Sequence, residues 1–178
     1  MLHSTPSASE ATTSVLFVCH GNICRSTMAE FVMRHLVAEA GRAGELYVDS
    51  AATSREEIGN DVHPGTRRKL REMGIACGHH ASRQMGPADY ARFDYIVGMD
   101  EENMAGMYRL LLGERGFGWS WDAVSAAEAA KADPEGKVSK LLTWAGISRD
   151  VADPWYTGNF DATYDDVLLG CRAMLEQI

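Results

Sequence analysis

The sequence of 178 residues is poor in cysteine and proline and has no long apolar run. Its four cysteines, at positions 19, 24, 77 and 171, form no C-x-x-C pair, so neither a disulfide framework nor a structural zinc site is expected. No apolar run approaches the roughly 20 residues that a membrane span needs. Residues 1–14 have no cationic start and no apolar core, and they do not resemble a secretory signal. These absences predict a cytoplasmic protein without metal, cofactor or membrane partner.

Positive charge is also scarce, with 17 Lys and Arg against 25 Asp and Glu and a net charge of −8. Nucleic acids and anionic membranes require clustered positive charge, so neither is an expected partner. The basic run at 67–71 lies in a predicted helix and is typical of a solvated helix face. Taken alone, the acid excess also argues against phosphate-bearing substrates, but the segment from Cys19 to Ser26 contains no acidic residue.

Strand patterns alternate with helix patterns along the chain. Buried strands are predicted at 14–19, 46–50 and 94–99, with a weaker strand at 138–144. Helices are predicted at 27–40, 64–73, 101–112 and 161–178; the first starts with a capping box of Thr27 and Glu30 and the third is capped by Asp100. The segment 113–137 is predicted to be a long, partly helical excursion with exposed tryptophans. This alternation indicates an α/β fold with an open parallel sheet and helices on both faces. It forms a single domain at 14–178, preceded by a polar, disordered tail at 1–13.

The turn after the first strand carries the residues for phosphate chemistry. It runs Cys19-His-Gly-Asn-Ile-Cys-Arg-Ser26 and joins a strand end to a helix start, where backbone N–H groups and the helix dipole bind anions. Gly21 and Asn22 are the residues best suited to the left-handed conformations of such a nest. Nucleotide-binding fingerprints of the phosphate-loop and dinucleotide types are absent from the sequence.

Each residue type in this turn has a chemical role. A helix N-terminus and hydrogen-bond donors favour the thiolate form of a cysteine, which makes Cys19 the predicted nucleophile. Arg25 offers a planar fork that binds two phosphate oxygens and follows their charge in the transition state. Ser26 is placed to donate to the sulfur. Cys77 and Cys171 lack this context and are predicted to be small buried hydrophobes.

The stretch Val15-Leu-Phe-Val-Cys-His-Gly-Asn-Ile-Cys-Arg-Ser-Thr-Met-Ala-Glu30 resembles the opening of the low-molecular-weight protein-tyrosine phosphatases. Shorter matches extend the resemblance over most of 14–178: 49–51, 73–75, 80–83, 99–100 and 153–156. The resemblance implies a three-layer sandwich with a four-stranded parallel sheet. It also implies metal-independent hydrolysis of phosphotyrosine and aryl phosphates through a phosphocysteine intermediate.

The resemblance assigns a role to each matching residue. Cys19, Arg25 and Asp153 are similar to the family's nucleophile, transition-state arginine and general acid. The phosphate would be bound by the loop residues His20, Gly21, Asn22, Ile23, Cys24 and Arg25. Ser26, Ser50 and His80, together with Asn22, resemble the residues that keep the loop rigid. Cys24 resembles a second cysteine that bonds reversibly to the nucleophile on oxidation, and Trp155 and Tyr156 resemble an aromatic wall of the cleft.

The sequence departs from the family at two places. The segment 53–58, where the family often has a second aromatic wall, contains no aromatic residue and includes Glu56 and Glu57. These carboxylates predict a preference for neutral or basic sequence around the phosphorylated residue. The excursion at 113–137 is longer than the family usually has, and either Trp119 or Trp121 is a candidate for the missing wall, with packing against the sheet as the alternative.

Two other functions remain as alternatives. A thioredoxin-coupled arsenate reductase has a similar fold and loop, but it needs a further cysteine pair, and residues 94–110 contain no cysteine. An arginine-phosphate phosphatase is similar too, but it has threonine where this chain has Ile23. The expected partner is a phosphotyrosine-containing protein or a small aryl phosphate, and the protein itself is expected to be a monomer or a weak dimer.

Overall fold

The alternating side chains of the first strand divide the interior into two cores. In a computed structural model that describes residues 11–178, β1 (Thr13–Cys19) is buried on both faces. Val15, Phe17 and Cys19 pack into one hydrophobic cluster, and Leu16 and Val18 pack into the other. This alternation is what the two-residue period of a strand requires when both faces of a sheet are covered.

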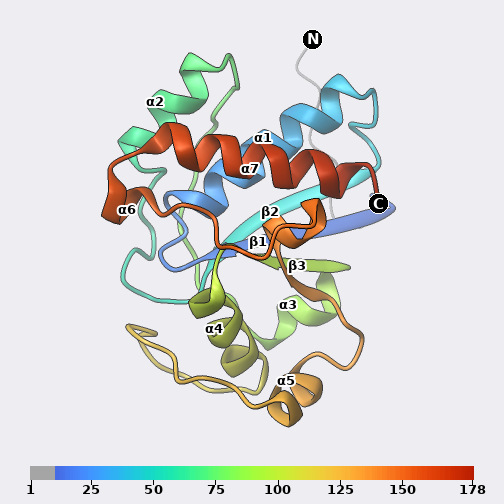
Figure 1. Ribbon diagram of the computed structural model, residues 1–178, viewed down its shortest axis with the longest axis vertical. Helices are drawn as coiled ribbons and strands as arrows, with labels where there is room; N and C mark the ends of the chain where they lie inside the picture. Colours follow the sequence, from blue (N-terminus) through green and yellow to red (C-terminus); the bar gives the residue numbers. More distant parts are fainter. Residues whose placement is uncertain (1–10) are drawn as a thin grey trace.

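The sheet has four parallel strands in the order β2-β1-β3-β4 (Figure 1). β1 lies between β2 (Leu46–Ala52) and β3 (Tyr95–Gly98), and β4 (Val138–Lys140) forms the outer edge beside β3. Since all strands run the same way, the loops that follow β1, β2 and β3 emerge at one edge of the sheet, where parallel α/β folds bind ligands. The predicted four-stranded parallel sheet is confirmed.

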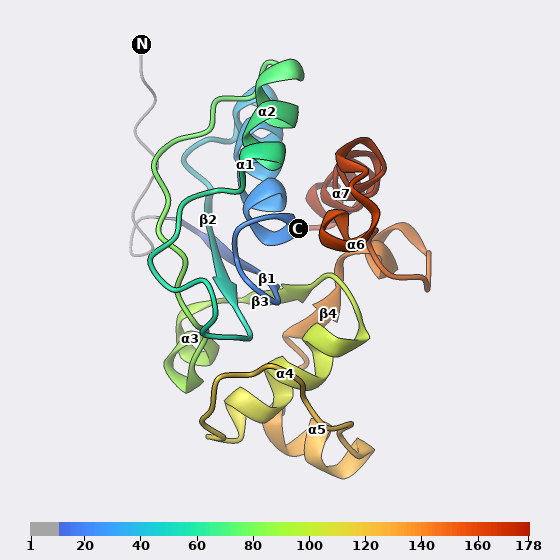
Figure 2. The same cartoon turned by 90° about the vertical axis from the view of Figure 1, so that its left-hand side faces the viewer.

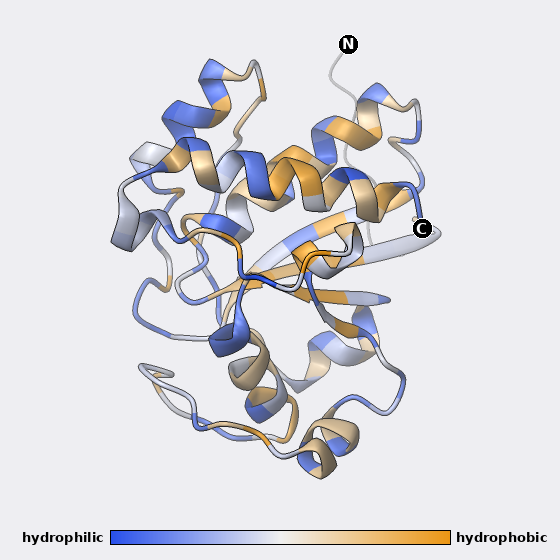
Figure 3. Ribbon diagram, viewed as in Figure 1, coloured by the Kyte–Doolittle hydropathy of each residue, from blue (hydrophilic) through white to orange (hydrophobic). Residues whose placement is uncertain are grey.

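Helices cover both faces of the sheet, so the predicted three-layer arrangement is also confirmed (Figure 2). Figure 3 shows hydrophobic residues along the strands and along parts of the two long helices that cover one face. One layer holds α1 (Arg25–Glu39), α2 (Pro64–Glu72), α6 (Pro154–Thr157) and α7 (Phe160–Leu175). The other layer holds α3 (Pro87–Arg92), α4 (Glu101–Leu111) and α5 (Ala126–Ala132).

The start of α1 differs from the prediction. The helix begins at Arg25, with Cys24 as N-cap and no side-chain capping bond, so the capping box of Thr27 and Glu30 is wrong. Thr27 Oγ1 donates to the carbonyl of Cys24 at 3.0 Å, and Glu30 is buried inside the protein. The early start leaves the first N–H groups of the helix directly behind the turn that follows β1.

The fourth strand also ends earlier than predicted. β4 stops at Lys140, and the chain continues as a 3₁₀ helix, η1 (Leu141–Ala145). Leu141 and Leu142 were predicted to be strand residues because they are apolar. In the structure they belong to η1 and are buried under α7. The close approach of Gly170 in α7, where a Cβ would lie 2.5 Å from Cγ of Leu141, shows how tightly this turn is packed.

The remaining predicted elements are found with small shifts, and α3 and α6 are additional short helices. The excursion is partly helical as predicted, since α5 starts with a capping box of Ser125 and Glu128. The disordered tail predicted at 1–13 lies mostly outside the described residues, but Thr12 and Thr13 both donate to the carbonyl of Glu45, so the ordered chain starts before residue 14. None of the helices in residues 11–178 is long and apolar enough to span a membrane.

Candidate active site

The turn that follows β1 contains one strained residue. Asn22 has a φ of 55°, and it is the only residue other than glycine with positive φ in the described part of the chain. Asparagine tolerates this left-handed region better than most side chains. The prediction of a positive φ at Gly21 as well is wrong. A Cβ at position 21 would lie 3.2 Å from Cγ of Glu57, so a larger residue there would require the Glu57 side chain to shift slightly.

The side chain of Asn22 is the centre of a buried hydrogen-bond network. Its Nδ2 donates to Oγ of Ser26 at 2.9 Å and to Oγ of Ser50 at 2.8 Å. Nε2 of His80 donates to the carbonyl of Asn22 at 2.8 Å. The three residues predicted to support the loop therefore lie around Asn22, and together they fix both its side chain and its backbone.

A second layer behind this network is not apparent from the sequence. Ser50 Oγ donates to Oε2 of Glu30 at 2.5 Å, and Arg34 pairs with the other oxygen of Glu30 at 2.7 Å. Burial raises the pKa of Glu30, although Arg34 and Ser50 offset part of this effect. Ser82 Oγ donates to the carbonyl of Gly21 at 2.8 Å. These partners come from α1 and from the segment after α2, so the loop is held from two directions.

The sulfur of Cys19 lies at the bottom of the turn and faces two hydrogen-bond donors. The backbone N–H of Asn22 donates to Sγ at 3.3 Å, and Oγ of Ser26 lies 3.1 Å from it. Because Ser26 Oγ already accepts a hydrogen bond from Asn22 Nδ2, its own proton is free to point at the sulfur. Donors at these positions stabilise a negative charge on sulfur.

The second cysteine of the turn has a different environment. Burial, together with the nearby charges of Cys19 and Asp153, raises the pKa of Cys24 to about 12. Cys24 is therefore a neutral thiol at physiological pH. Cys171 is fully buried in the core, as predicted, whereas Cys77 is only partly buried at the edge of that core, so its predicted burial is wrong.

Arg25 is the first residue of α1 and is buried between two carboxylates. Its Nη1 donates to Oδ2 of Asp100 at 2.6 Å, and its Nη2 lies 2.7 Å from Oδ2 of Asp153. Burial disfavours the charged guanidinium, but Cys19, Asp100 and Asp153 outweigh it and raise the pKa of Arg25. The sequence predicts Asp100 only as a helix cap, a role it also has, since Oδ1 accepts from the N–H of Asn103 at 2.7 Å.

Asp153 lies at the mouth of the turn on a segment fixed by α7. Asp153 Oδ1 accepts from the N–H of Trp155 at 3.0 Å and caps α6. The preceding residue, Ala152, donates its N–H to Asp166 Oδ2 at 3.0 Å and accepts from Thr163 Oγ1 at 2.8 Å. This anchoring holds the carboxylate opposite Cys19 while leaving its side chain about 23% exposed.

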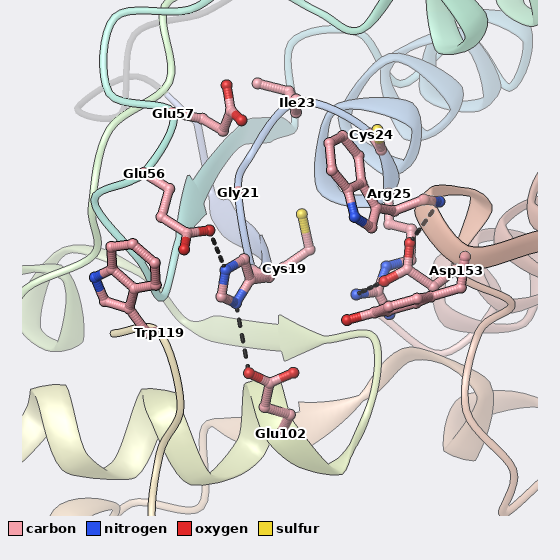
Figure 4. A pocket seen from close by; sticks show the side chains of 13 residues that line it. Cys19, Gly21, Ile23, Cys24, Arg25, Glu56, Glu57, Glu102, Trp119 and Asp153 are labelled. Atoms are coloured by element: carbon pink, nitrogen blue, oxygen red, sulfur yellow. Dashed lines mark hydrogen bonds and ion pairs between the residues drawn. The ribbon is translucent and has the colours of Figure 1, made fainter. Parts of the chain in front are cut away.

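These residues line a pocket of about 350 Å³ (Figure 4). Figure 4 shows Asp153 on one side of Cys19 and Trp119 on the other. The lining residues are Cys19, His20, Gly21, Ile23, Cys24, Arg25, Glu56, Glu57, Glu102, Trp119, Asp153, Trp155 and Tyr156. The pocket thus gathers every predicted catalytic, phosphate-binding and wall residue except Asn22, which is buried behind the turn with its supports.

The side chain of His20 lies at the rim of the pocket rather than over its base. Its Nε2 is 2.7 Å from Oε2 of Glu56, and its Nδ1 is 3.5 Å from Oε1 of Glu102. The imidazole of His20 therefore faces carboxylates, and the predicted phosphate contact of His20 would have to be made by its backbone N–H. Glu102 was not predicted to belong to the site, since on sequence it is only an acidic residue in the first turn of α4.

No group of three or more His, Cys, Asp and Glu side chains arranged to hold a metal ion occurs within residues 11–178. The single carboxylates near the sulfur, Asp100 and Asp153, are each paired with Arg25. Both carboxylates therefore hold the guanidinium of Arg25 in a fixed orientation at the base of the pocket.

Comparison with known proteins gives one consistent result. The family model described as low molecular weight phosphotyrosine protein phosphatase matches residues 14–115. The low molecular weight protein-tyrosine-phosphatase YfkJ of Bacillus subtilis is 38% identical over 93% of this chain and 95% of its own length. Its crystal structure superimposes with a TM-score of 0.80, covering 94% of this chain and 95% of the other.

Two more distant relatives extend the comparison. The low molecular weight phosphotyrosine protein phosphatase of Homo sapiens is 36% identical over 96% of this chain and 98% of its own. The crystal structure of a Drosophila arginine phosphatase has a TM-score of 0.74 at 27% identity, covering 92% of this chain and 96% of the other. On the sequence matches and the shared fold, this chain belongs to the family of low molecular weight phosphotyrosine protein phosphatases.

Proposed function

We propose that this chain hydrolyses phosphotyrosine and related aryl phosphates through a phosphocysteine intermediate, without a metal ion. The observation that carries the proposal is the placement of three groups in one pocket: the sulfur of Cys19, the guanidinium of Arg25 and the carboxylate of Asp153. A nucleophile, an anion-binding cation and a proton donor are the groups that transfer of a phosphoryl group to sulfur requires.

In the first step, the sulfur of Cys19 attacks phosphorus from the base of the pocket. The S–P bond forms while the bond from phosphorus to the phenolic oxygen breaks. Arg25 and the N–H groups of the turn stabilise the charge on the three remaining oxygens. Asp153, at the mouth, transfers a proton to the leaving phenolic oxygen, so that tyrosine departs as a neutral phenol.

In the second step, water attacks the phosphocysteine from the mouth of the pocket. Asp153, now a carboxylate, accepts a proton from this water as the new P–O bond forms and the S–P bond breaks. The donors from Ser26 and the N–H of Asn22 stabilise the negative charge that returns to sulfur. Inorganic phosphate then leaves and the enzyme returns to its starting state.

The aromatic residues at the mouth favour an aryl substrate. The exposed Trp155 and Tyr156 are separated from Asp153 only by Pro154 and line the pocket, where they provide flat apolar surface for a ring attached to the bound phosphate. Ile23 adds an aliphatic side chain from the turn itself. Hydrolysis of phosphoarginine, the activity named for the Drosophila relative, is the second candidate. An aliphatic residue at 23 and aromatic walls favour the aryl phosphate over the polar guanidino group.

Arsenate reduction is less consistent with the site. That reaction passes a disulfide from the nucleophile to further cysteines. β3 and α4 contain no cysteine, and Cys171 of α7 is buried in the core.

We infer that the protein acts on phosphotyrosine-containing proteins in the cytoplasm, as a monomer or weak dimer.

A single preparation can test this proposal. We expect the wild-type protein to hydrolyse a phosphotyrosyl peptide and p-nitrophenyl phosphate in the presence of a chelator, and to release phosphate from a phosphoarginine peptide and reduce arsenate much more slowly. Rapid acid quenching followed by mass analysis should show one phosphoryl group on the peptide that contains Cys19. Cys19→Ser should lose turnover and retain the native circular dichroism spectrum. Appreciable hydrolysis by Cys19→Ser, or dependence on an added metal, would refute the proposed mechanism.

A further inference from the structure

The segment between α4 and α5 brings the side chain of Trp119 to the pocket. The family resemblance assigns no role to this residue. Trp119 lines the pocket and is 72% exposed, whereas Trp121, two residues later, packs against the core beneath the sheet. In extended chain, residues two apart ordinarily lie on the same side. Here the chain is not extended but bends at Trp119 and Ser120, so the two tryptophan side chains lie against different parts of the molecule.

Trp121 anchors this segment in a slot made by two glycines. A Cβ on Gly106 in α4 would lie 2.7 Å from Cδ1 of Trp121, and a Cβ on Gly118 would lie 2.9 Å from its Cζ2. The segment is also tied to the loop after β2, because the N–H of Arg55 donates to the carbonyl of Phe117 at 2.8 Å. Trp119 is therefore presented to the pocket by a fixed support.

The charged side chains that line the pocket near Trp119 are acidic, while the basic Arg55 of the same region lies over the ring of Phe117 instead. Glu56, Glu57 and Glu102 line the same pocket as Trp119, and Figure 4 draws Glu56, Glu57 and Trp119 on the side of Cys19 away from Asp153. Among the described residues that line the pocket, the basic groups are Arg25 and His20. Arg25 is already paired with two carboxylates, and His20 lies between Glu56 and Glu102.

We infer that Trp119, Glu56 and Glu102 form a specificity subsite for a lysine or arginine side chain next to the phosphorylated tyrosine. The inference rests on the proposed function, because the phosphotyrosine itself would occupy the turn at Cys19. An exposed aromatic ring beside carboxylates fits an alkyl stem that carries a positive charge, since the ring face and the carboxylates both attract the cation. Glutamate at the same substrate position would be repelled.

The test compares phosphotyrosyl peptides that differ at one position. Lysine, norleucine or glutamate is placed in turn at each of the three positions on either side of phosphotyrosine, and kcat/KM is measured for each peptide. For the wild-type protein, we expect lysine to exceed norleucine by about fivefold at one or more positions, the scale of a cation–π contact combined with partly exposed ion pairs. The preference should shrink in 0.5 M NaCl, because exposed charges are screened.

The variants assign the preference to these residues. Trp119→Ala should bring the ratio of lysine to norleucine close to one, Trp119→Phe should restore most of it, and Glu56→Gln and Glu102→Gln should each lower it. Two matched variants should keep the wild-type ratio: Phe117→Ala, an exposed aromatic residue of the same segment that does not line the pocket, and Glu176→Gln, an exposed acid at the end of α7. A ratio is used because it is independent of losses that affect all peptides equally.

The outcomes separate this inference from the proposed function. If the wild-type protein hydrolyses the norleucine peptides but shows no lysine preference at any position, the subsite is disproved and the phosphatase activity stands. A preference that survives in Trp119→Ala and in both glutamine variants also disproves it. If no phosphotyrosyl peptide is hydrolysed, the proposed function itself fails.

Discussion

The carboxylate of Asp100 connects the start of α4 to the guanidinium of Arg25. One oxygen accepts from the N–H of Asn103 and caps the helix, and the other accepts from Nη1 of Arg25 at 2.6 Å. One side chain therefore fixes both the element that follows β3 and the cation proposed to bind phosphate. The charge on Asp100 is needed to pair with Arg25 but not to cap the helix, because asparagine also caps helices.

This separation leads to a prediction for Asp100→Asn. We expect the variant to fold with little loss of stability and to lose about tenfold in kcat/KM, the factor that corresponds to about 1.4 kcal/mol of lost orientation at Arg25. Steady-state kinetics with p-nitrophenyl phosphate and thermal unfolding measure the two effects. Asp100→Ala removes the cap as well and should lower the melting temperature further. Activity of Asp100→Asn equal to wild type would show that the ion pair does not orient Arg25.

Asp153 is predicted to act on the leaving group, and Asp153→Asn tests this. Asparagine keeps the cap of α6, in which Oδ1 accepts from the N–H of Trp155, but it has no proton to transfer. Turnover of phenyl phosphate, whose leaving group needs protonation, should fall by about 10² or more. An activated dinitrophenyl ester should be affected far less in its first step, measured as the burst of released phenol. Equal losses for the two esters would exclude Asp153 as the acid.

The environment of Cys24 predicts selective alkylation. Its pKa of about 12 leaves only a minute fraction of thiolate at pH 7.5, whereas the sulfur of Cys19 faces two donors at the base of an open pocket. Iodoacetamide at low excess should therefore modify Cys19 first and leave Cys24 unmodified, as read by peptide mapping. Saturating inorganic phosphate should protect Cys19. Comparable labelling of both cysteines in the native protein would contradict this view of the turn.

Local patterns in the sequence predicted the parts of the site that are close together along the chain. The segment from Cys19 to Ser26 carries the proposed nucleophile, the left-handed turn and the start of the helix within eight residues, so this part of the site is defined by one segment. Asp100, by contrast, reaches Arg25 across 75 residues, and only the pairing of β1 with β3 brings the two together. A long-range contact of this kind leaves no local pattern in the sequence from which it could be predicted.

The same reasoning explains which secondary-structure predictions failed. Thr27 and Glu30 match a capping box, but the turn before α1 starts the helix at Arg25, and burial of Glu30 against Ser50 takes its carboxylate away from the helix end. Leu141 and Leu142 match a strand, but the short β3 gives them no further partner, and they pack under α7 as a 3₁₀ turn. In both cases tertiary contacts outweigh a local preference.

The glycine slot around Trp121 predicts an effect of a single methyl group. Gly106→Ala places a Cβ 2.7 Å from Cδ1 of Trp121 and 2.8 Å from Cγ2 of the fully buried Thr53, so at least one of these groups must shift. We expect a loss of about 1–3 kcal/mol in the free energy of unfolding, measured by urea denaturation. Gly44→Ala is the matched control, because a Cβ there meets no atom within 4 Å, and it should change stability by less than about 0.5 kcal/mol. Similar stability of the two variants would disprove the tight packing of Trp121.

The environment of Asp166 on α7 predicts that stability depends on pH and that this carboxylate supports the segment of Asp153, the proposed general acid. Its carboxylate accepts two hydrogen bonds from the guanidinium of Arg149, at 2.8 and 2.6 Å, and one from the N–H of Ala152, the residue before Asp153. Burial raises the pKa of Asp166, but Arg149 and the Ala152 N–H outweigh it and lower the pKa below the ordinary value. A lowered pKa in the folded state means that the ionised carboxylate stabilises the fold.

The sign of the pH effect follows from this shift. The stabilisation is present above the unfolded pKa of about 3.9 and is lost as the pH falls through the lower folded value. Asp166→Asn should therefore lower the free energy of unfolding by about 1–2 kcal/mol at pH 7, a modest value because Arg149 is largely exposed. The difference between wild type and variant should shrink as the pH is lowered below 4. The variant should also lose more activity on phenyl phosphate than on the dinitrophenyl ester, because the segment that holds Asp153 is released while Cys19 and Arg25 are untouched. A stability difference that stays constant from pH 7 to pH 3 would show that the charge of Asp166 does not hold this segment.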